Sequence, residues 1–216
     1  METTRDTARI NKNKFVSQSR SQQQIWNAIA SEWHKYKTIP AKHTIEFLKK
    51  TYGNVLDLGS GSGRHLVKIK KGKMYLVDFS KKMLELAEKK SKEEKINAEI
   101  KQANIWKIPY ENEFFDFAIC ISALHCVKGL KNREKTIKEL YRVLKKGGKA
   151  EIGVWNIKSK RFKNSKKEKY IRWKDKGKRY YYLYDEKEVH NLFKESGFKI
   201  ISIHNSEMMI NFVVEK

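Results

Sequence analysis

Short apolar runs alternate along this chain with stretches of helical periodicity. Seven runs have the length and continuity of buried strands: residues 54–58, 74–78, 98–102, 115–122, 149–155, 198–204 and 209–214. Apolar spacing and cap residues predict helices over residues 21–37, 44–52, 63–70, 132–144 and 185–196, and after Ser80. Continuous apolar strands that alternate with helices are typical of a parallel sheet covered on both faces.

The last two strands depart from this alternation. Only a short polar segment separates residues 198–204 from residues 209–214, whereas a parallel crossover needs a dozen or more residues. These strands are therefore expected to form an antiparallel hairpin. The pattern predicts an α/β fold with a doubly wound, seven-stranded, mostly parallel sheet that ends in this hairpin.

Composition limits the class of protein. The 216 residues fit one domain, and a hydrophobic content of 39% excludes a disordered polyelectrolyte. No apolar run nears the roughly 20 residues of a membrane helix, and the N-terminus has no secretory signal, so we expect a cytoplasmic protein without membrane contact. Cys120 and Cys126 cannot build a disulfide framework and lack the partner spacing of a zinc site. No metal is predicted.

Two segments of the chain, an N-terminal tail and an insertion, carry an excess of basic residues. The formal net charge is +23, from 48 Lys and Arg against 25 Asp and Glu. Residues 1–20 are polar and basic and are expected to be a flexible tail, before a single domain over residues 21–216 that begins with helices in residues 21–52. An insertion over residues 156–182 contains residues 158–179, where 12 basic side chains oppose two acids. Interleaved aromatics there favour a nucleic-acid partner, and the alternative is a solvated lysine-rich surface.

The sharpest motif is the Gly-rich loop after the first strand, formed by Asp57, Gly59, Ser60, Gly61 and Gly63. Its glycines permit a tight turn and close approach of the backbone to a ligand. Asp57 would repel a pyrophosphate but suits the ammonium group of an amino-acid-like ligand. Asp78 ends the second strand about 20 residues further on, where an acid accepts hydrogen bonds from ribose hydroxyls.

Together these features resemble the S-adenosylmethionine site of class I methyltransferases, whose Rossmann-like fold also ends with an antiparallel strand. The resemblance implies S-adenosyl-L-methionine as cofactor, bound by the loop and by Asp78. It places Asn104 and Ile105 at the adenine and Ser122 beside the sulfonium. Phe79 would flank the adenosine, and its alternative is an ordinary core position.

The two ends of the chain narrow the resemblance. Residues 25–30, Trp33, Pro40, residues 180–184 and residues 211–216 resemble segments of the tRNA wobble-uridine carboxymethyl methyltransferases. These enzymes esterify 5-carboxymethyluridine at the first anticodon position. The resemblance implies a tRNA anticodon stem-loop as substrate and a small zinc-binding activator subunit as a partner. Lys37 replaces an Arg of the family, which exchanges a bidentate fork for a point charge.

The acceptor side has its own candidates. A carboxylate acceptor is already ionised at pH 7, so His125 is expected to orient it rather than act as a base; the alternative is a satisfied core histidine. Trp173 and the tyrosines could stack on RNA bases, or the tyrosines could pack one face of a strand on the core. Candidate contacts to substrate or RNA are Lys37, Arg172, Trp173, Lys174, Arg179, Tyr180 and Asn211. A small-molecule methyltransferase and a non-catalytic RNA-binding module are the competing functions.

Overall fold

The computed structural model describes residues 20–216, so residues 1–19 of the predicted tail lie outside the described residues. The helices are α1 (Gln22–Tyr36), α2 (Lys42–Leu48), α3 (Lys81–Glu93), α4 (Leu130–Val143) and α5 (Glu186–Glu195), with 3-10 turns η1 (Leu124–Cys126) and η2 (Lys160–Phe162). The strands are β1 (Tyr52–Leu58), β2 (Lys70–Asp78), β3 (Ala98–Gln102), β4 (Phe115–Ile121), β5 (Leu144–Trp155), β6 (Glu168–Arg172), β7 (Lys178–Tyr182), β8 (Lys199–Ile203) and β9 (Met209–Glu215). None of the helices in residues 20–216 has the length and apolar character needed to cross a lipid bilayer.

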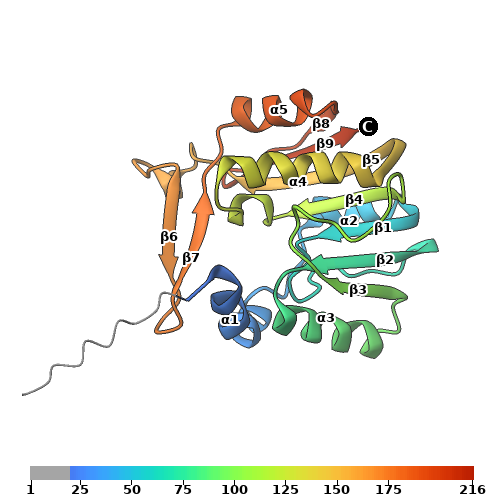
Figure 1. Ribbon diagram of the computed structural model, residues 1–216, viewed down its shortest axis with the longest axis horizontal. Coiled ribbons are helices and arrows are strands. Elements are labelled where there is room, and N and C mark those ends of the chain that lie inside the picture. Colours follow the sequence, from blue (N-terminus) through green and yellow to red (C-terminus); the bar gives the residue numbers. More distant parts are fainter. Residues whose placement is uncertain (1–19) are drawn as a thin grey trace, which may run out of the picture.

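Seven strands form one sheet in the order β3-β2-β1-β4-β5-β9-β8 (Figure 1). Neighbours from β3 to β5 are parallel, and β9 runs antiparallel to both β5 and β8. The predicted α/β sheet with an antiparallel terminal hairpin is confirmed, with a strand at each of the seven predicted positions. The apolar runs identified these strands because the sheet is covered on both faces.

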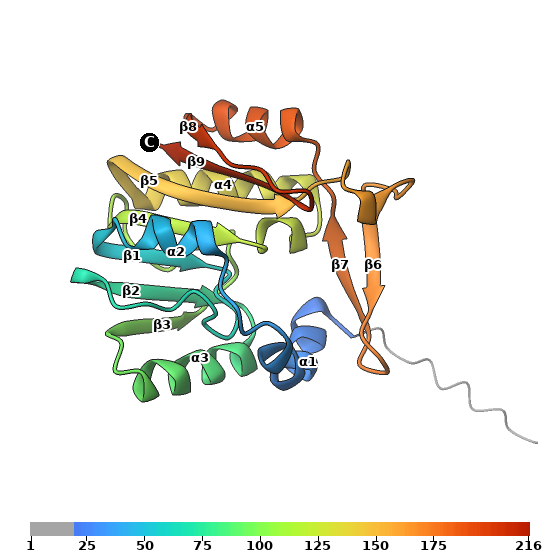
Figure 2. The same cartoon turned by 180° about the vertical axis from the view of Figure 1, so that it is seen from behind.

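The two faces have separate apolar cores. On one face, α4 and α5 contribute Leu140 and Phe193 to a cluster with Leu58. On the other face, Leu48 of α2 joins Val55 and Leu66 (Figure 2). The predicted α2 ends earlier than residue 52, because β1 already begins at Tyr52.

The helix predicted over residues 63–70 is absent. The loop ends in turns at residues 61–65, residues 66–69 are irregular, and β2 begins at Lys70. Because Lys70 lies level with Tyr52 in the sheet, the chain must return past all seven residues of β1. A helix rises about 1.5 Å per residue and an extended chain about 3.3 Å, so only irregular, extended chain spans that distance in the residues available.

Helix α1 and the β6–β7 hairpin lie together at the carboxyl end of the sheet (Figure 1). Ser21 caps α1 in a reciprocal capping box with Gln24. The amide Oε1 of Gln22 accepts a hydrogen bond from the backbone N–H of Tyr180 at 2.8 Å. On its other side α1 is tied to the start of α3, where Asn27 Oδ1 accepts from the Ser80 hydroxyl at 2.7 Å. The helix is therefore held from both sides across the end of the sheet.

Candidate functional site

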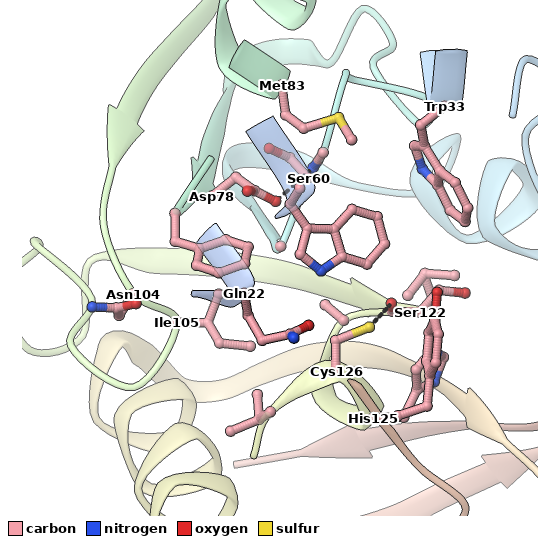
Figure 3. A pocket seen from close by; sticks show the side chains of 18 of the residues that line it. Gln22, Trp33, Ser60, Asp78, Met83, Asn104, Ile105, Ser122, His125 and Cys126 are labelled. Atoms are coloured by element: carbon pink, nitrogen blue, oxygen red, sulfur yellow. Dashed lines mark hydrogen bonds between the residues drawn. The ribbon is translucent and has the colours of Figure 1, made fainter. Parts of the chain in front are cut away.

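A cavity of about 230 Å³ opens at the carboxyl ends of β1, β2 and β4. The Gly-rich loop forms one wall, α1 closes the opposite side with Trp26 and Trp33, and η1 forms the floor with His125 and Cys126 (Figure 3). In a parallel α/β sheet this edge is where ligands bind. We take this cavity as the candidate active site.

The glycines of the loop have different roles. Gly59 and Gly61 have φ values of +78° and +54°, which favour glycine. A Cβ on Gly59 would lie 2.2 Å from the Cβ of Ala123, so the loop packs closely on the segment after β4. A Cβ on Gly61 would meet no atom within 4 Å. Because Gly61 also lines the cavity, its missing side chain leaves space for a ligand.

Two carboxyl groups lie at this end of the sheet. Asp57 is 2% exposed, its Oδ2 has no hydrogen-bond partner in the described residues, and burial raises its pKa to about 7. Asp78 accepts hydrogen bonds from the backbone N–H groups of Gly61 at 2.9 Å and Ser80 at 2.8 Å. Burial nevertheless raises the pKa of Asp78 to about 6. A buried carboxyl oxygen without a donor calls for a cationic or hydrogen-bonding ligand.

An aromatic cluster of three rings borders the other side of the cavity. The ring of Trp155 stacks on that of His125, at a centroid distance of 4.9 Å, and on that of Tyr181, at 4.2 Å. The His125 and Tyr181 rings also approach each other, to a centroid distance of 5.7 Å. Burial lowers the pKa of His125 to about 3, so its imidazole is neutral at pH 7. Burial also raises the pKa values of Tyr181 and Cys126 above their ordinary range. None of these three groups is ionised at neutral pH.

Four cations converge near this aromatic cluster: Lys37, Arg64, Arg161 and Arg179. Burial lowers the pKa of Lys37, and the charges of the three arginines lower it further. Within residues 20–216 no carboxylate lies at ion-pair distance from any of the four. Asp78 is the sole acid among the described residues that line the cavity. We call these four residues the cation cluster.

The cavity gathers most of the residues predicted to hold a cofactor. Gly59, Ser60, Gly61, Asp78, Phe79, Asn104, Ile105 and Ser122 line it. Asp57 and Gly63 lie behind the loop, where a Cβ on Gly63 would touch Ala87 of α3 at 3.2 Å. His125 also lines the cavity, and its Nδ1 accepts the backbone N–H of Trp155 at 3.1 Å. The pocket thus unites the predicted cofactor residues apart from the two behind the loop.

The predicted RNA contacts divide into four groups. Arg172 and Lys174 are exposed on the β6–β7 hairpin, and Lys37 lines the cavity. Tyr180 and Asn211 are 0% and 1% exposed, so neither presents a surface to RNA in this structure, and the expectation for both is wrong. The tyrosines instead follow the alternative interpretation, because Tyr180, Tyr182 and Tyr184 belong to the core.

Arg179 and Trp173 are committed to contacts inside the protein. Arg179 is 5% exposed, and its guanidinium lies 4.8 Å from the ring centroid of Trp173 and 5.1 Å from that of Trp33. The indole N–H of Trp173 donates to Glu32 at 2.7 Å. Together with Lys176 and Lys174, this donor holds the pKa of Glu32 at about 2. Base stacking on Trp173 is therefore replaced by packing of the hairpin on α1.

Several lining residues were not predicted as site residues, among them Gln22, Arg64, Trp155 and Tyr181. Arg64 has a local signal, since it is a cation that directly follows the last glycine of the loop. Trp155 and Tyr181 have none, because their contact with His125 depends on how the insertion folds back over the sheet.

Comparisons with known proteins agree with this geometry. Residues 56–152 match the sequence profile of a methyltransferase domain. An uncharacterized protein of Methanocaldococcus jannaschii is 34% identical over 176 residues, which cover 79% of this chain and 77% of that protein. The tRNA (carboxymethyluridine(34)-5-O)-methyltransferase ALKBH8 of Mus musculus is 30% identical over 153 residues, 70% of this chain. The ubiquinone/menaquinone biosynthesis C-methyltransferase UbiE of Vibrio cholerae is 31% identical over 101 residues, 44% of this chain.

The lengths of these relatives differ from that of the chain. The matched segments span 22% of ALKBH8 and 38% of UbiE. Among solved structures, a SAM-dependent methyltransferase of Methanosarcina mazei has a TM-score of 0.67 at 21% identity, covering 82% of this chain and 98% of its own. A chain of the complex that contains the Haloferax volcanii Trm112 methyltransferase activator also has a TM-score of 0.67, at 16% identity, covering 92% of this chain and 99% of its own. These likenesses show the fold.

Proposed function

This chain belongs to the class I S-adenosylmethionine-dependent methyltransferases, and we propose that it methylates the carboxylate of 5-carboxymethyluridine at the wobble position of tRNA. When bound, S-adenosylmethionine would supply a methyl group on a positively charged sulfur; the acceptor would receive this methyl group and the sulfur would depart as a neutral thioether. The residues of the chain then have three roles. They bind the cofactor, hold the acceptor in line with the methyl group and keep water away.

The residues that line the cavity, together with Asp57 behind the loop, fit this cofactor. The unpartnered Oδ2 of Asp57 matches the ammonium of the methionine part, because a buried carboxylate needs a cation or a donor. The buried Ser60 hydroxyl, which also lacks a partner in the described residues, adds a second polar group on that side. Asp78 keeps lone pairs for ribose hydroxyls while it accepts the two backbone N–H groups. We assign the adenine to Asn104 and Ile105 and the adenosine contact to Phe79.

The observation that carries the choice of acceptor is the cation cluster. Lys37 faces Arg64, Arg161 and Arg179 closely enough for their charges to lower its pKa. Like charges held together destabilise one another. The charge of Asp57 offsets part of this repulsion at Arg64, and an anionic ligand removes the repulsion that remains. A carboxylate next to the bound cofactor meets this requirement. A neutral acceptor would leave the repulsion unrelieved, which argues against a small neutral substrate such as a quinone.

No side chain of the aromatic cluster is an ionised base, and neither is Cys126 beside it, which supports the same acceptor. His125, Tyr181 and Cys126 are all uncharged at pH 7, as their shifted pKa values require. A carboxylate needs no base, because it is ionised already. What remains for the protein is orientation, which can supply about 7–11 kcal/mol. We assign the orienting role to His125, because its Nδ1 accepts from Trp155 and its proton is therefore on Nε2, which is a donor.

The β6–β7 hairpin supplies a surface for the tRNA. Of the 12 basic residues in 158–179, four pair with acids: Lys158, Lys167, Lys174 and Lys176. Within the described residues the other eight basic side chains have no acidic partner at ion-pair distance. Two of these eight, Arg172 and Lys166, are exposed, and we assign both to phosphate contacts. The insertion is thereby the substrate-side element of the fold.

Similarity supports the proposal and suggests a partner. ALKBH8 shares 30% identity over 70% of this chain, a wider span than the match to UbiE. The fold is also like that of a chain in the complex with the Trm112 activator. We therefore include a small zinc-binding activator subunit among the partners to be tested.

The experiment supplies radiolabelled S-adenosylmethionine and tRNA that carries unmethylated 5-carboxymethyluridine, with and without the activator. Base-labile label in the anticodon nucleoside is the expected result, because the product is an ester. Demethylmenaquinone is offered to the same protein as the competing acceptor. Label that enters the quinone and not the tRNA overturns the proposal in favour of a small-molecule enzyme.

A further inference from the structure

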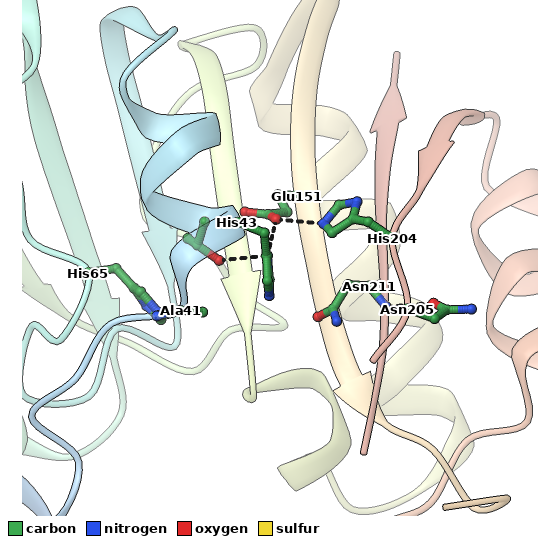
Figure 4. A network of polar contacts seen from close by, with 8 residues as sticks. Ala41, His43, His65, Glu151, His204, Asn205 and Asn211 are labelled. Carbon is green, nitrogen blue, oxygen red and sulfur yellow. Dashed lines mark hydrogen bonds and ion pairs between the residues drawn. The ribbon is translucent and has the colours of Figure 1, made fainter. Parts of the chain in front are cut away.

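Three metal-ligating side chains meet away from the pocket, on the face of the sheet that α2 covers. His43 lies in α2, Glu151 in β5 and His204 just after β8 (Figure 4). The Oε1 atom of Glu151 is 2.6 Å from Nδ1 of His43 and 2.9 Å from Nε2 of His204. The two imidazole rings approach to a centroid distance of 4.9 Å. Both histidines therefore point one nitrogen at the same carboxyl oxygen.

Glu151 lacks a fixed positive charge beside it. Its side chain is 1% exposed, and within residues 20–216 its ion-pair partners are the two histidines alone. Its Oε2 has no hydrogen-bond partner there. Buried carboxylates are normally paired with a cation or bound to a metal, and histidine, unlike Lys and Arg, has no fixed charge at neutral pH. In a chain with 48 Lys and Arg, a buried carboxylate without either of them points to another source of positive charge.

The spacing suits a small divalent cation. The candidate ligand atoms of the three residues all lie within 4.8 Å of one another. In a tetrahedral zinc site, nitrogen and oxygen ligands at about 2.0–2.2 Å from the ion are roughly 3.4 Å apart. The short contacts therefore need to open by less than about 1 Å. The His43 and His204 side chains are 32% and 31% exposed, which leaves the cluster open to water on one side.

We propose that His43, Glu151 and His204 bind one zinc ion, with water as the fourth ligand. Two imidazoles and one carboxylate form a ligand set that zinc uses in proteins. The ion joins α2 to β5 and to the end of β8. Coordination of the ion would stabilise α2, because this helix has seven residues and its N-cap, Ala41, makes no side-chain cap hydrogen bond. The proposal does not depend on the acceptor of the methyl group.

The experiment is a calorimetric titration of the full-length protein with Zn²⁺ after treatment with a chelator. We expect one ion per chain and a melting temperature about 5–10 °C higher at a zinc concentration 100 times the Kd. Substitution of Co²⁺ should give the intense visible absorption of a tetrahedral site. His43→Gln and His204→Gln should each weaken binding at least tenfold. His34→Gln is the matched control, since His34 belongs to no such cluster in the described part of the chain.

Two results overturn the proposal. The first is a wild-type protein that takes up no zinc, which would make the cluster a hydrogen-bonded ion pair. The second is unchanged binding in both His43→Gln and His204→Gln, which would place the ion elsewhere. Should either variant fail to fold, the stoichiometry and the cobalt spectrum of the wild-type protein still decide between a site and no site.

Discussion

The imidazole of His125 lies against the indole of Trp155 and accepts a hydrogen bond from the Trp155 backbone N–H at 3.1 Å. This contact fixes the tautomer of His125, because Nδ1 must be the unprotonated nitrogen. Burial lowers the pKa of the ring to about 3, so the relationship holds throughout the physiological pH range. The 3-10 turn η1 is thereby connected to β5 at the acceptor side of the cavity.

Replacement of His125 should show what this hydrogen bond contributes. His125→Leu leaves a buried backbone N–H without a partner, and we expect a loss of about 1–3 kcal/mol in the free energy of unfolding. The Oδ1 atom of Asn can accept the same hydrogen bond, so His125→Asn should lose less. Urea denaturation of the two variants measures the difference. Equal stability of both would show that the Trp155 N–H finds another partner.

The pKa of Asp57 leads to a pH dependence of cofactor binding. Burial raises this pKa to about 7 in the free protein, so the carboxyl group is mostly protonated at pH 5.5. An ammonium group binds the ionised form, and the affinity for S-adenosylmethionine should therefore rise about tenfold from pH 5.5 to pH 7, with a proton released on binding. Calorimetry in buffers of different ionisation enthalpy measures both quantities. Asp57→Asn should bind weakly and lose most of the rise; an unchanged slope would exclude Asp57 as its source.

The same group should affect the stability of the cofactor-free protein. A carboxyl pKa that is higher in the folded than in the unfolded state means that the folded chain binds more protons between about pH 4 and pH 7. Its contribution to stability is therefore present at low pH and lost as the pH rises through 7. The wild-type minus Asp57→Asn difference in unfolding free energy should fall across this range. A constant difference would contradict the raised pKa.

Alanine substitutions at Gly59 and Gly61 should separate the packing of the loop from its role in cofactor binding. Gly59→Ala places a Cβ 2.2 Å from that of Ala123, so we expect a loss of stability of about 1–3 kcal/mol beyond the backbone strain. Gly61→Ala meets no protein atom within 4 Å and should cost about 1 kcal/mol from its positive φ. Its Cβ would enter the cavity, however, and cofactor affinity should fall at least about tenfold. Thermal melts and calorimetry separate the two effects, and full cofactor affinity in Gly61→Ala would place the ligand away from this loop.

The cation cluster should matter for the acceptor and not for the cofactor. Lys37→Gln removes one charge from a carboxylate contact, and kcat/KM for tRNA should fall about 10- to 100-fold, with cofactor affinity unchanged. Lys138→Gln, an exposed lysine on α4, is the matched control for loss of charge. Equal effects of the two substitutions would mean that Lys37 acts only through the net charge of the protein.

The salt dependence of tRNA affinity tests the role of the hairpin in phosphate binding. Each phosphate contact that is lost should reduce the slope of log affinity against log salt by about 0.7–0.9. Arg172→Gln combined with Lys166→Gln is therefore expected to flatten the slope for tRNA binding and to leave methyl transfer to a minimal nucleoside acceptor unchanged. A tRNA slope equal to that of the wild-type protein would move the binding surface off this hairpin.

The sequence predicts the sheet well, because each central strand is buried on both faces and shows as an apolar run, as in β1 and β4. It fails between β1 and β2, where the local pattern of residues 63–70 suits a helix but the chain is too short to return as one. It also does not reveal β6, whose charges obscure the alternation, and it indicates β7 only through the alternative interpretation of the tyrosines. The periodicity of apolar residues indicates which positions are buried, but it carries no information about the distance that the chain must span between two strands.

The site divides in the same way. The loop and Asp78 are predictable because the loop directly follows β1 and Asp78 is the last residue of β2, so topology alone brings them together. The cation cluster and the histidines near Glu151 depend on long-range packing: His43 and His204 are 108 and 53 residues away from Glu151. Sequence spacing carries no signal for such pairs. For the same reason the burial of Asn211 becomes visible only in the structure.

Nucleoside mass spectrometry of tRNA from cells that lack this protein decides whether the wobble carboxylate is the acceptor. We expect the methyl ester of 5-carboxymethyluridine to disappear and the free acid to accumulate. Expression of the wild-type chain should return both nucleosides to their normal levels, whereas expression of Gly61→Ala should not. An unchanged level of the ester in those cells would contradict the assignment, whatever the protein methylates in vitro.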